Sequence, residues 1–402
     1  MYTETILDAP VFSVSSLYDE LDKIADILKQ NVSHEQENRR ISPEVLNALR
    51  SAGFLRLFLP KSLGGLEVDP LTAAKLVEEV GKYNTTAAWA MMVANTAIWW
   101  CNRLPAAGVE EIFSDGADTF IAGAFHPPMK ASPVDGGFII NGRTPLASNV
   151  HEAKWIFVTA FVMEGESMKF NNGIPEIIGV FMKADDCRII DTWHTIGMKA
   201  TDSNDISAEE VFVPHHLSYP LVPTFSPSIH YSGPLYRFPA IGASIASLIT
   251  PVALAVARNA IDELKVLAKR KIPFASTVSI REKGSAQRKL GMAEAFVQSG
   301  RAYLHGELTS CWNKILKEET ITLEERARLV LAVTHTNQTC HQAVDMMYSL
   351  GGTSGIYLTN TLSRYFTDAQ VIRQHGFANE SRYETAGQVY FDLPPDLPVI
   401  IF

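Results

Sequence analysis

In residues 351–387, GGTSGIYLTNTLSRYFTDAQVIRQHGFANESRYETAG, a glycine-rich break is followed by a short helical pattern that carries a histidine. Its first glycines interrupt a helical pattern, and glycine lets backbone approach a ligand closely since no Cβ stands in the way. The eight residues after Asp368 predict a helix that ends at Gly376, with His375 on its last turn. An imidazole at that place is suited to face a cleft and to exchange a proton near neutral pH. Under the other interpretation, the glycines form a plain turn between helices and the histidine is structural.

The composition sets limits on the location and the partners. The chain of 402 residues exceeds the size of one hydrophobic core, so two or three domains are expected. The net charge of -9 comes with no Lys/Arg block, and nucleic acid is therefore not an expected partner. Four well-separated cysteines and histidines without ligand spacing predict no disulfide, no metal and a cytoplasmic location. Residues 1–14 lack the features of a secretory signal, and the apolar run 240–257 predicts a buried helix rather than a membrane span.

Residues 1–118 are predicted to be a helical domain. Ser42 has the place of an N-cap, Pro43 stands at the first helical position, and Gly53 follows the end of that helix. A later segment, TTAAWAMMVANTAIWWCNRL, is apolar almost all round and predicts a largely buried helix. Its indoles, Trp89, Trp99 and Trp100, are candidates for a pocket wall, although an aromatic-rich buried helix is more often plain core.

The sequence pattern changes from helical to strand-like at residue 119, and it becomes helical again after residue 228. Short runs of β-branched and aromatic residues, split by Gly, Pro, Asn and Asp, predict an antiparallel sandwich or barrel of about seven strands that ends near Pro214. A proline-rich irregular loop follows it. Four long amphipathic segments in residues 229–402 then predict a four-helix bundle. The expected domains are therefore 1–118, 119–228 and 229–402.

Four motifs resemble the acyl-CoA dehydrogenase superfamily in order and spacing. They are LRSAGFLRLFLPKSLGG (49–65), ASNVHEAKW (147–155), GMKATDSNDISAEEVFVP (197–214) and the glycine loop with its helix. The resemblance covers nearly the whole chain. It implies a mainly α fold with a central β-barrel between a helical domain and a four-helix bundle, and it implies a flavin cofactor.

The place of the catalytic base separates two branches of this superfamily. Many of its dehydrogenases carry a glutamate eight residues after the aspartate that corresponds to Asp368, and here that count reaches Gly376. Other members place the base early in the bundle, but residues 236–259 contain no Asp or Glu. The nearest candidate for a displaced base is Glu380. His375 instead resembles the histidine of the two-component flavin-dependent monooxygenases that share this fold.

That resemblance implies a function. In those enzymes a separate NAD(P)H–flavin reductase supplies reduced FMN or FAD, O2 adds at the flavin C4a position, and the histidine lies beside the peroxide. The expected reaction is oxygenation of a small aromatic molecule that is phenolic, indolic or heteroaromatic, by a homotetramer. A dehydrogenase with a displaced base and a flavin-binding protein without chemistry of its own remain the alternatives.

The resemblance also assigns roles to individual residues. The catalytic pair is His375 and Ser148, whose hydroxyl faces the flavin N5 edge. The other residues expected near the flavin are Ala122, Gly123, Ala124, Thr201, Ser203, Gly351, Gly352 and Arg270, the last reaching the phosphate of a neighbouring subunit. The residues expected to line the substrate pocket are Trp89, Asn95, Trp99, Phe125 and His126.

The chain departs from the family pattern at two places. Phenol hydroxylases of this group carry a histidine on the buried helix, where this chain reads VANTAIWW (93–100), so an ortho-hydroxylated phenol is not favoured. The barrel strand reads TDS where relatives often show TGS, which puts Asp202 in place of glycine. A carboxylate repels a phosphate, and weaker flavin binding through that loop is therefore expected.

Overall fold

The computed structural model describes residues 14–402; residues 1–13, in which the sequence predicts no secretory signal, lie outside the described part. The α-helices are α1 (Val14–Asn38), α2 (Pro43–Ser51), α3 (Pro70–Tyr83), α4 (Thr85–Trp100), α5 (Ala106–Ile112), α6 (Thr250–Arg270), α7 (Gly284–Leu316), α8 (Leu323–Gly351), α9 (Thr361–Ile372) and α10 (Arg382–Tyr390). The strands are β1 (Ile121–Val134), β2 (Gly137–Ala147), β3 (Trp155–Glu164), β4 (Ser167–Met168), β5 (Phe170–Asn171), β6 (Ile174–Pro175), β7 (Ile177–Lys183), β8 (Arg188–Ile190), β9 (Asn204–Pro214) and β10 (Ser218–Pro220).

The predicted helix signals in the N-terminal part are confirmed. The Ser42 hydroxyl accepts the Val45 N–H at 3.2 Å, Pro43 begins α2, and Gly53 beyond its end has φ +77°. That angle is one that glycine adopts without steric cost. Helix α4 is buried along nearly its whole length, as its apolar sequence predicts.

The central sheet is mixed and open, which corrects two expectations. Its strand order is β10-β7-β3-β1-β2-β9-β8, with β4 beside β3. Within residues 14–402 the edge strands β10 and β8 do not pair with each other, so no closed barrel forms. The pair β1–β3 is parallel rather than antiparallel, with Gly123 opposite Phe157. The reason is topological: β2 returns along one side of β1, and the chain then crosses to the other side before β3 begins.

The bundle is formed by α6, α7, α8 and α9, as predicted, with α8 in contact with the other three. The buried run before α6 is a π-helix, Ile241–Ile249, rather than an α-helix. Pro251 follows it, and proline lacks an N–H and clashes with the carbonyl four residues earlier in a regular α-helix. The segment Ile241–Arg270 is long and apolar enough to cross a membrane, but 94% of its most apolar window is buried inside the protein. It is a core helix.

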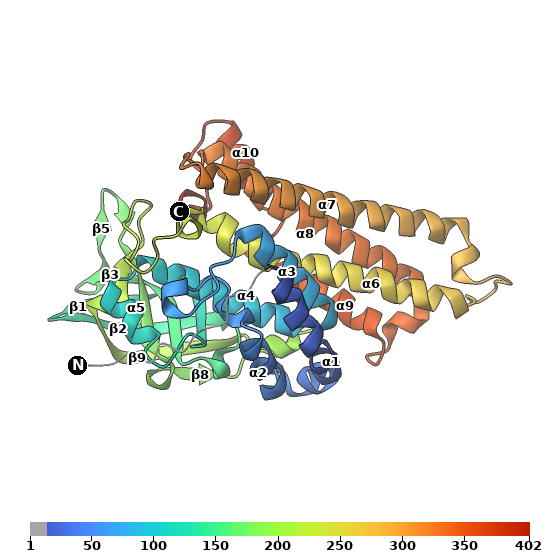
Figure 1. The fold of residues 1–402 in the computed structure, drawn as a ribbon, viewed down its shortest axis with the longest axis horizontal. Helices are drawn as coiled ribbons and strands as arrows, with labels where there is room; N and C mark the ends of the chain where they lie inside the picture. The colour runs from blue at the N-terminus through green and yellow to red at the C-terminus, as the bar shows by residue number, and fades with distance from the viewer. Residues whose placement is uncertain (1–13) are drawn as a thin grey trace.

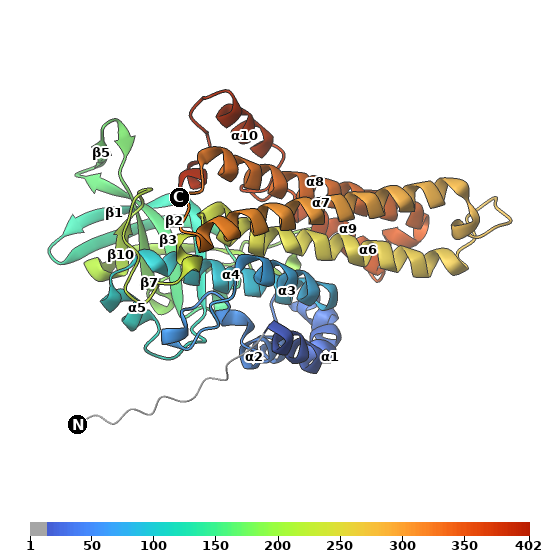
Figure 2. The same ribbon diagram turned by 45° about the horizontal axis from the view of Figure 1, so that its top comes forward.

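The parts meet around α4. The sheet lies at one end of the molecule and the bundle extends away from it, with α3 and α4 along the bundle's side (Figures 1 and 2). Helix α4 contacts both β1 and the π-helix before α6. It therefore joins the sheet to the bundle. The boundaries after residues 118 and 228 stay predictions, which the order of elements supports.

Helix α9 differs from the expectation in its limits. It spans Thr361–Ile372, so Asp368 lies inside it and His375 lies in the turn beyond its end. The sequence placed the helix end at Gly376 because glycine usually marks a stop. Here the chain leaves the helix earlier, and the His375 carbonyl accepts the N–H groups of Ala378 and Asn379 in the following turn.

Candidate functional site

Three hydroxyls and an indole form a buried chain of hydrogen bonds where α4 meets the sheet. Ser148 follows the end of β2, and Ser203 directly precedes β9. The Trp89 indole N–H donates to the Ser148 hydroxyl at 3.0 Å, and that hydroxyl lies 2.7 Å from the Ser203 hydroxyl. The Thr201 hydroxyl lies 2.7 Å from Ser203 and donates to the Met198 carbonyl at 2.9 Å. Ser148, Ser203 and Thr201, all predicted near the flavin, are thus linked to one another, and Trp89 is bonded to the Ser148 end of the chain.

His375 lies beside the same indole. The rings of Trp89 and His375 meet edge to face at a centroid distance of 6.0 Å. The His375 Nδ1 accepts the Phe377 backbone N–H at 3.4 Å, so a neutral ring carries its hydrogen on Nε2. Burial lowers the pKa of His375 from 6.5 to about 4. The imidazole is therefore neutral at physiological pH, with an N–H on Nε2.

Aromatic rings continue from the imidazole towards the sheet. Phe377 lies 5.6 Å from the His375 ring and 6.0 Å from Phe125, and Phe125 lies 5.4 Å from Trp100. Phe125 and Trp100 were both candidates for a pocket wall, whereas Phe377 was not predicted. Phe377 gave no signal in the sequence, because it lies in the turn after α9, which only the tertiary fold brings close to α4.

Asp368 fixes the start of the loop that carries the hydroxyls. Its carboxylate accepts the Met198 N–H at 2.6 Å. A Cβ on Gly197 would lie 2.2 Å from the Thr367 carbonyl oxygen, so only glycine lets the loop lie against α9. Burial raises the pKa of Asp368 to about 6. The aspartate thus positions the loop 197–203 relative to the turn that bears His375.

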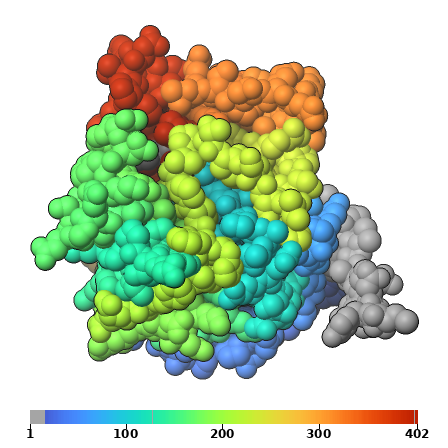
Figure 3. Space-filling model, turned by 90° about the vertical axis from the view of Figure 1, so that its left-hand side faces the viewer, coloured from blue at the N-terminus to red at the C-terminus, as the bar shows by residue number. Residues whose placement is uncertain are grey.

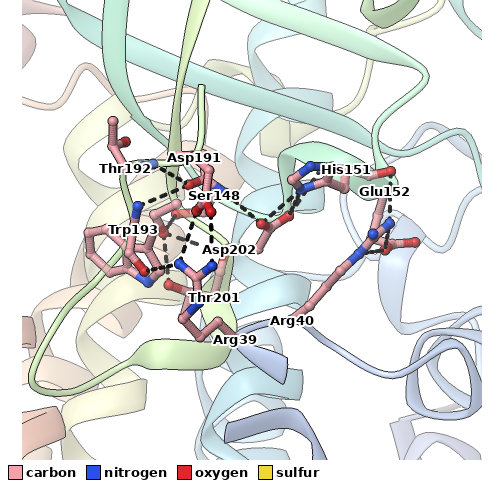
Figure 4. Close-up of polar contacts among 12 residues, drawn as sticks. Arg39, Arg40, Ser148, His151, Glu152, Asp191, Thr192, Trp193, Thr201 and Asp202 are labelled. Carbon is pink, nitrogen blue, oxygen red and sulfur yellow. Dashed lines mark hydrogen bonds and ion pairs between the residues drawn. The ribbon is translucent and has the colours of Figure 1, made fainter. Parts of the chain in front are cut away.

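Asp202 is turned away from the hydroxyl chain (Figure 4). The carboxylate accepts the His151 backbone N–H at 3.1 Å and lies 2.9 Å from the His151 Nδ1. The Asn204 amide donates to it at 2.7 Å, and Asp202 is only 3% exposed. Burial raises its pKa, and the hydrogen bonds from His151 counteract that shift. The geometry gives no support to the expected repulsion of a flavin phosphate, because the charge is engaged inside the protein.

The other predicted residues fall into separate places. The strand 122–124 is buried or nearly so and runs beside β3, while His126 is exposed. Asn95 uses its amide to bind the Phe58 N–H and the Phe54 and Met91 carbonyls, and the Trp99 indole donates to the Leu235 carbonyl. These contacts favour core roles for both residues, whose assignment to the pocket stays a prediction.

Arg270, Gly351 and Gly352 lie away from the hydroxyl chain. Arg270 ends α6, and Lys271, the next residue, donates from Nζ to the Gly351 carbonyl. These residues therefore share the end of the bundle where α6 and α8 stop. They precede α9, and His375 follows it; a 12-residue helix is about 18 Å long. Within a single chain, Arg270 and the two glycines therefore do not lie beside His375.

The residues at the hydroxyl chain fit a flavin ring. The Asn149 amide, next to Ser148, is buried, and among residues 14–402 neither its nitrogen nor its oxygen has a hydrogen-bond partner. Buried polar atoms are almost always hydrogen-bonded, so an unpaired amide beside a hydroxyl chain indicates a polar ligand. The ring edge of a flavin offers both donors and acceptors. Gly123 lets its strand lie close to Phe157, because a Cβ there would lie 3.2 Å from that ring.

The fold and the hydroxyl chain where α4 meets the sheet are those of a flavin enzyme. Comparison with known proteins gives the family. The model "Acyl-CoA dehydrogenase, N-terminal domain" matches residues 20–112, and "Acyl-CoA dehydrogenase, C-terminal domain" matches residues 247–380. Together they span more than half of the chain. The chain belongs to the acyl-CoA dehydrogenase superfamily.

Relatives that match nearly the whole chain include oxygenases. Indole-3-acetate monooxygenase of Pseudomonas putida is 28% identical over 93% of both chains. The oxygenase subunit HsaA, a flavin-dependent monooxygenase of Rhodococcus jostii, is 23% identical over 93% of this chain and 98% of its own. The structure of XiaF from Streptomyces sp. in complex with FADH2 and glycerol matches with a TM-score of 0.87 and 21% identity, over 96% of this chain and 97% of that one.

Proposed function

We propose that this chain is the oxygenase component of a two-component flavin-dependent monooxygenase. It takes reduced FMN or FAD from a separate NAD(P)H–flavin reductase and oxygenates a small aromatic molecule. One oxygen atom of O2 enters the substrate and the other leaves as water, while the reduced flavin supplies the two electrons. The full-length similarity to oxygenase components supports this assignment.

The observation that carries the proposal is the neutral imidazole at the position after α9. His375 offers an Nε2–H beside the indole that is bonded to Ser148. Many thioester dehydrogenases of this superfamily carry a carboxylate at this place or early in the bundle, and this chain has Gly376 here and no Asp or Glu in residues 236–259. An imidazole that is already neutral donates a hydrogen bond without first losing a proton, and it holds or passes a proton at Nε2.

A bound reduced flavin supplies electrons to O2. Ser148 would offer its hydroxyl to the flavin, and the Trp89 N–H fixes the orientation of that hydroxyl. The Ser203 hydroxyl bonds to Ser148, and the Thr201 hydroxyl bonds to Ser203. The aromatic rings of Phe125 and Phe377 exclude water from the face next to His375. These side chains orient the reacting groups and protect them from solvent.

The residues at the far end of the bundle have a place in a homotetramer. Arg270, Gly351 and Gly352 lie at the opposite end of α9 from His375, away from the hydroxyl chain. We assign them to the phosphate and adenine end of the flavin in a neighbouring subunit. A cytoplasmic location agrees with four free cysteines.

The geometry offers little support for an acyl-CoA dehydrogenase, because no carboxylate is placed to act as its catalytic base among the three considered. Glu380, the candidate for a displaced base, is exposed. The carboxylates of Asp202 and Asp368 are both engaged in hydrogen bonds to neighbouring backbone. A flavin-binding role without chemistry leaves the placement of His375 beside Trp89 unexplained.

Anaerobic addition of an acyl-CoA thioester to the FAD-loaded protein distinguishes an oxygenase from an acyl-CoA dehydrogenase. An oxygenase leaves the oxidised flavin spectrum unchanged, because no group removes the α-proton of the thioester. Bleaching of the flavin on addition of octanoyl-CoA contradicts the proposal. The positive arm adds reduced FMN, O2 and indole to the same preparation, and we expect an oxygenated indole.

A further inference from the structure

Arg103 is a buried cation without a counterion. It lies in the turn directly after α4 and is 6% exposed. Its Nη1 donates to the Val222 carbonyl at 2.7 Å, while Nε and Nη2 have no partner. Within residues 14–402 no carboxylate lies within ion-pair distance of this guanidinium. A buried charge is normally paired, so an unpaired one is costly.

Aromatic rings surround the guanidinium in place of a carboxylate. Its central carbon lies 3.7 Å from the Phe225 ring centroid, 5.1 Å from Phe402 and 5.3 Å from Trp100. Such cation–π contacts offset part of the cost of burial. Burial lowers the pKa of Arg103 to about 10, so the group stays charged at neutral pH.

Further polar groups near Arg103 also lack partners. Neither atom of the buried Asn102 amide is hydrogen-bonded, and the hydroxyls of Tyr219 and Ser228 are buried and unpaired. Ser228 adjoins Asn102, because its backbone N–H donates to the Asn102 carbonyl at 2.8 Å. Tyr219 interacts electrostatically with Arg103. Several unsatisfied donors in one buried region indicate a place built for a polar ligand group.

This region is continuous with the oxygenation site. Trp100, which packs against Arg103, is 5.4 Å from Phe125, and Phe125 leads through Phe377 to His375. The proline-rich loop before α6 frames a hollow on the surface in which the segment near residue 100 is visible (Figure 3). One apolar wall thus runs from the imidazole to the guanidinium.

We propose that Arg103 binds the carboxylate of an aromatic acid whose ring lies along this wall. The free Nε and Nη2 hydrogens form the edge of the guanidinium that pairs with both oxygens of a carboxylate. The Val222 carbonyl holds the opposite side of the group and so fixes the direction of that edge. This assignment rests on the proposed function and narrows its substrate class from small aromatic molecules to aromatic acids.

The test compares acids with their neutral amides. Titration calorimetry measures binding of indole-3-acetate, phenylacetate and benzoate, and of the three corresponding amides, to the flavin-loaded protein. We expect wild type to bind at least one acid about tenfold or more tightly than its amide. In Arg103→Met the preference disappears through loss of acid binding, and amide binding stays unchanged. Arg103→Lys keeps the positive charge but not the paired N–H donors of the guanidinium, so we expect it to show only part of the wild-type preference for acids.

The control is Arg258→Met, which removes a guanidinium paired with Asp262 and Glu294 elsewhere in the bundle. It should leave the acid preference intact. Equal binding of acids and amides by wild type, no binding of any acid, or a parallel loss of both ligands in Arg103→Met overturns the proposal. Wild type alone decides the first two outcomes even if the variant fails to fold. The oxygenation of neutral indole is measured separately, so failure of the carboxylate assignment is distinct from failure of the oxygenase assignment.

Discussion

Two buried polar regions at opposite ends of α4 differ in how their hydrogen bonds are satisfied. Around Ser148 the indole, the hydroxyls and the loop carbonyl bond one another in an unbroken chain. Around Arg103 several donors and acceptors have no partner in the protein. The hydroxyl chain of the first region is satisfied within the protein, with only the neighbouring Asn149 amide unpaired, whereas in the second region the unpaired groups include the charged guanidinium itself. Mutation should therefore have opposite effects on stability in the two regions.

The largest expected effect is on the chemistry in the satisfied region. His375→Ala removes the Nε2 donor, and we expect product formation to fall about 100-fold or more. Oxidation of reduced flavin by O2 should continue and release hydrogen peroxide. Product and peroxide per reduced flavin measure this, with the exposed His194→Ala as control. Unchanged product per flavin would show that the imidazole is structural.

Ser148→Ala breaks the chain and leaves the Trp89 N–H buried without a partner. We expect the free energy of unfolding to fall by about 1–3 kcal/mol, measured by chemical denaturation. The control Ser203→Ala keeps the bond between Trp89 and Ser148 and should cost less, about 1 kcal/mol. Equal losses in the two variants would mean that the indole bond is not the stabilising element.

Arg103→Met should change stability in the opposite direction to Ser148→Ala. Replacing an unpaired buried cation by an apolar side chain of similar length should raise the free energy of unfolding by about 1–2 kcal/mol in the absence of ligand. The same denaturation experiment measures it. A loss of stability instead would show that the protein itself satisfies this guanidinium.

A smaller effect concerns pH. The pKa of His375 is about 4 in the folded protein, below its ordinary value of 6.5. As pH falls from 6.5 towards 4, the unfolded chain takes up a proton that the folded chain does not, so stability falls. His375→Gln should remove on the order of 1–2 kcal/mol of this acid destabilisation. An unaltered pH dependence of unfolding in the variant would place the imidazole in a water-like environment.

The smallest expected effect is that of Asp202→Asn. The carboxylate is held by His151 and Asn204, so its charge is not directed at a bound phosphate. We expect the Kd for reduced FMN to change by less than about threefold, in equilibrium dialysis under anaerobic conditions. A tenfold tightening would restore the expectation that this aspartate repels the flavin.

The sequence predicted the fold well wherever local signals decide it. The Ser42 cap, the apolar α4 and the four bundle helices follow from residue patterns within one segment. The open sheet and its parallel pair did not follow, because strand pairing depends on which segments meet in space. The early end of α9 was missed since Gly376 is a stop signal that lies beyond the true stop.

The candidate site was predicted only in part. Ser148, Thr201, Ser203 and His375 came from family motifs, and the structure gathers them with Trp89. Arg103 carried no motif: an arginine after a helix is usually a solvated residue near the helix end. Only its burial, its unpaired nitrogens and the rings around it single it out.

Transfer of oxygen from isotopically labelled O2 to an aromatic molecule distinguishes an oxygenase from a protein that only binds or oxidises flavin. The purified protein is mixed with reduced FMN, labelled O2 and either indole or indole-3-acetate, and the products are analysed by mass spectrometry. The proposed function predicts one labelled oxygen atom in each product molecule, and loss of that product in His375→Ala. Product without label, or only hydrogen peroxide from wild type, would contradict it.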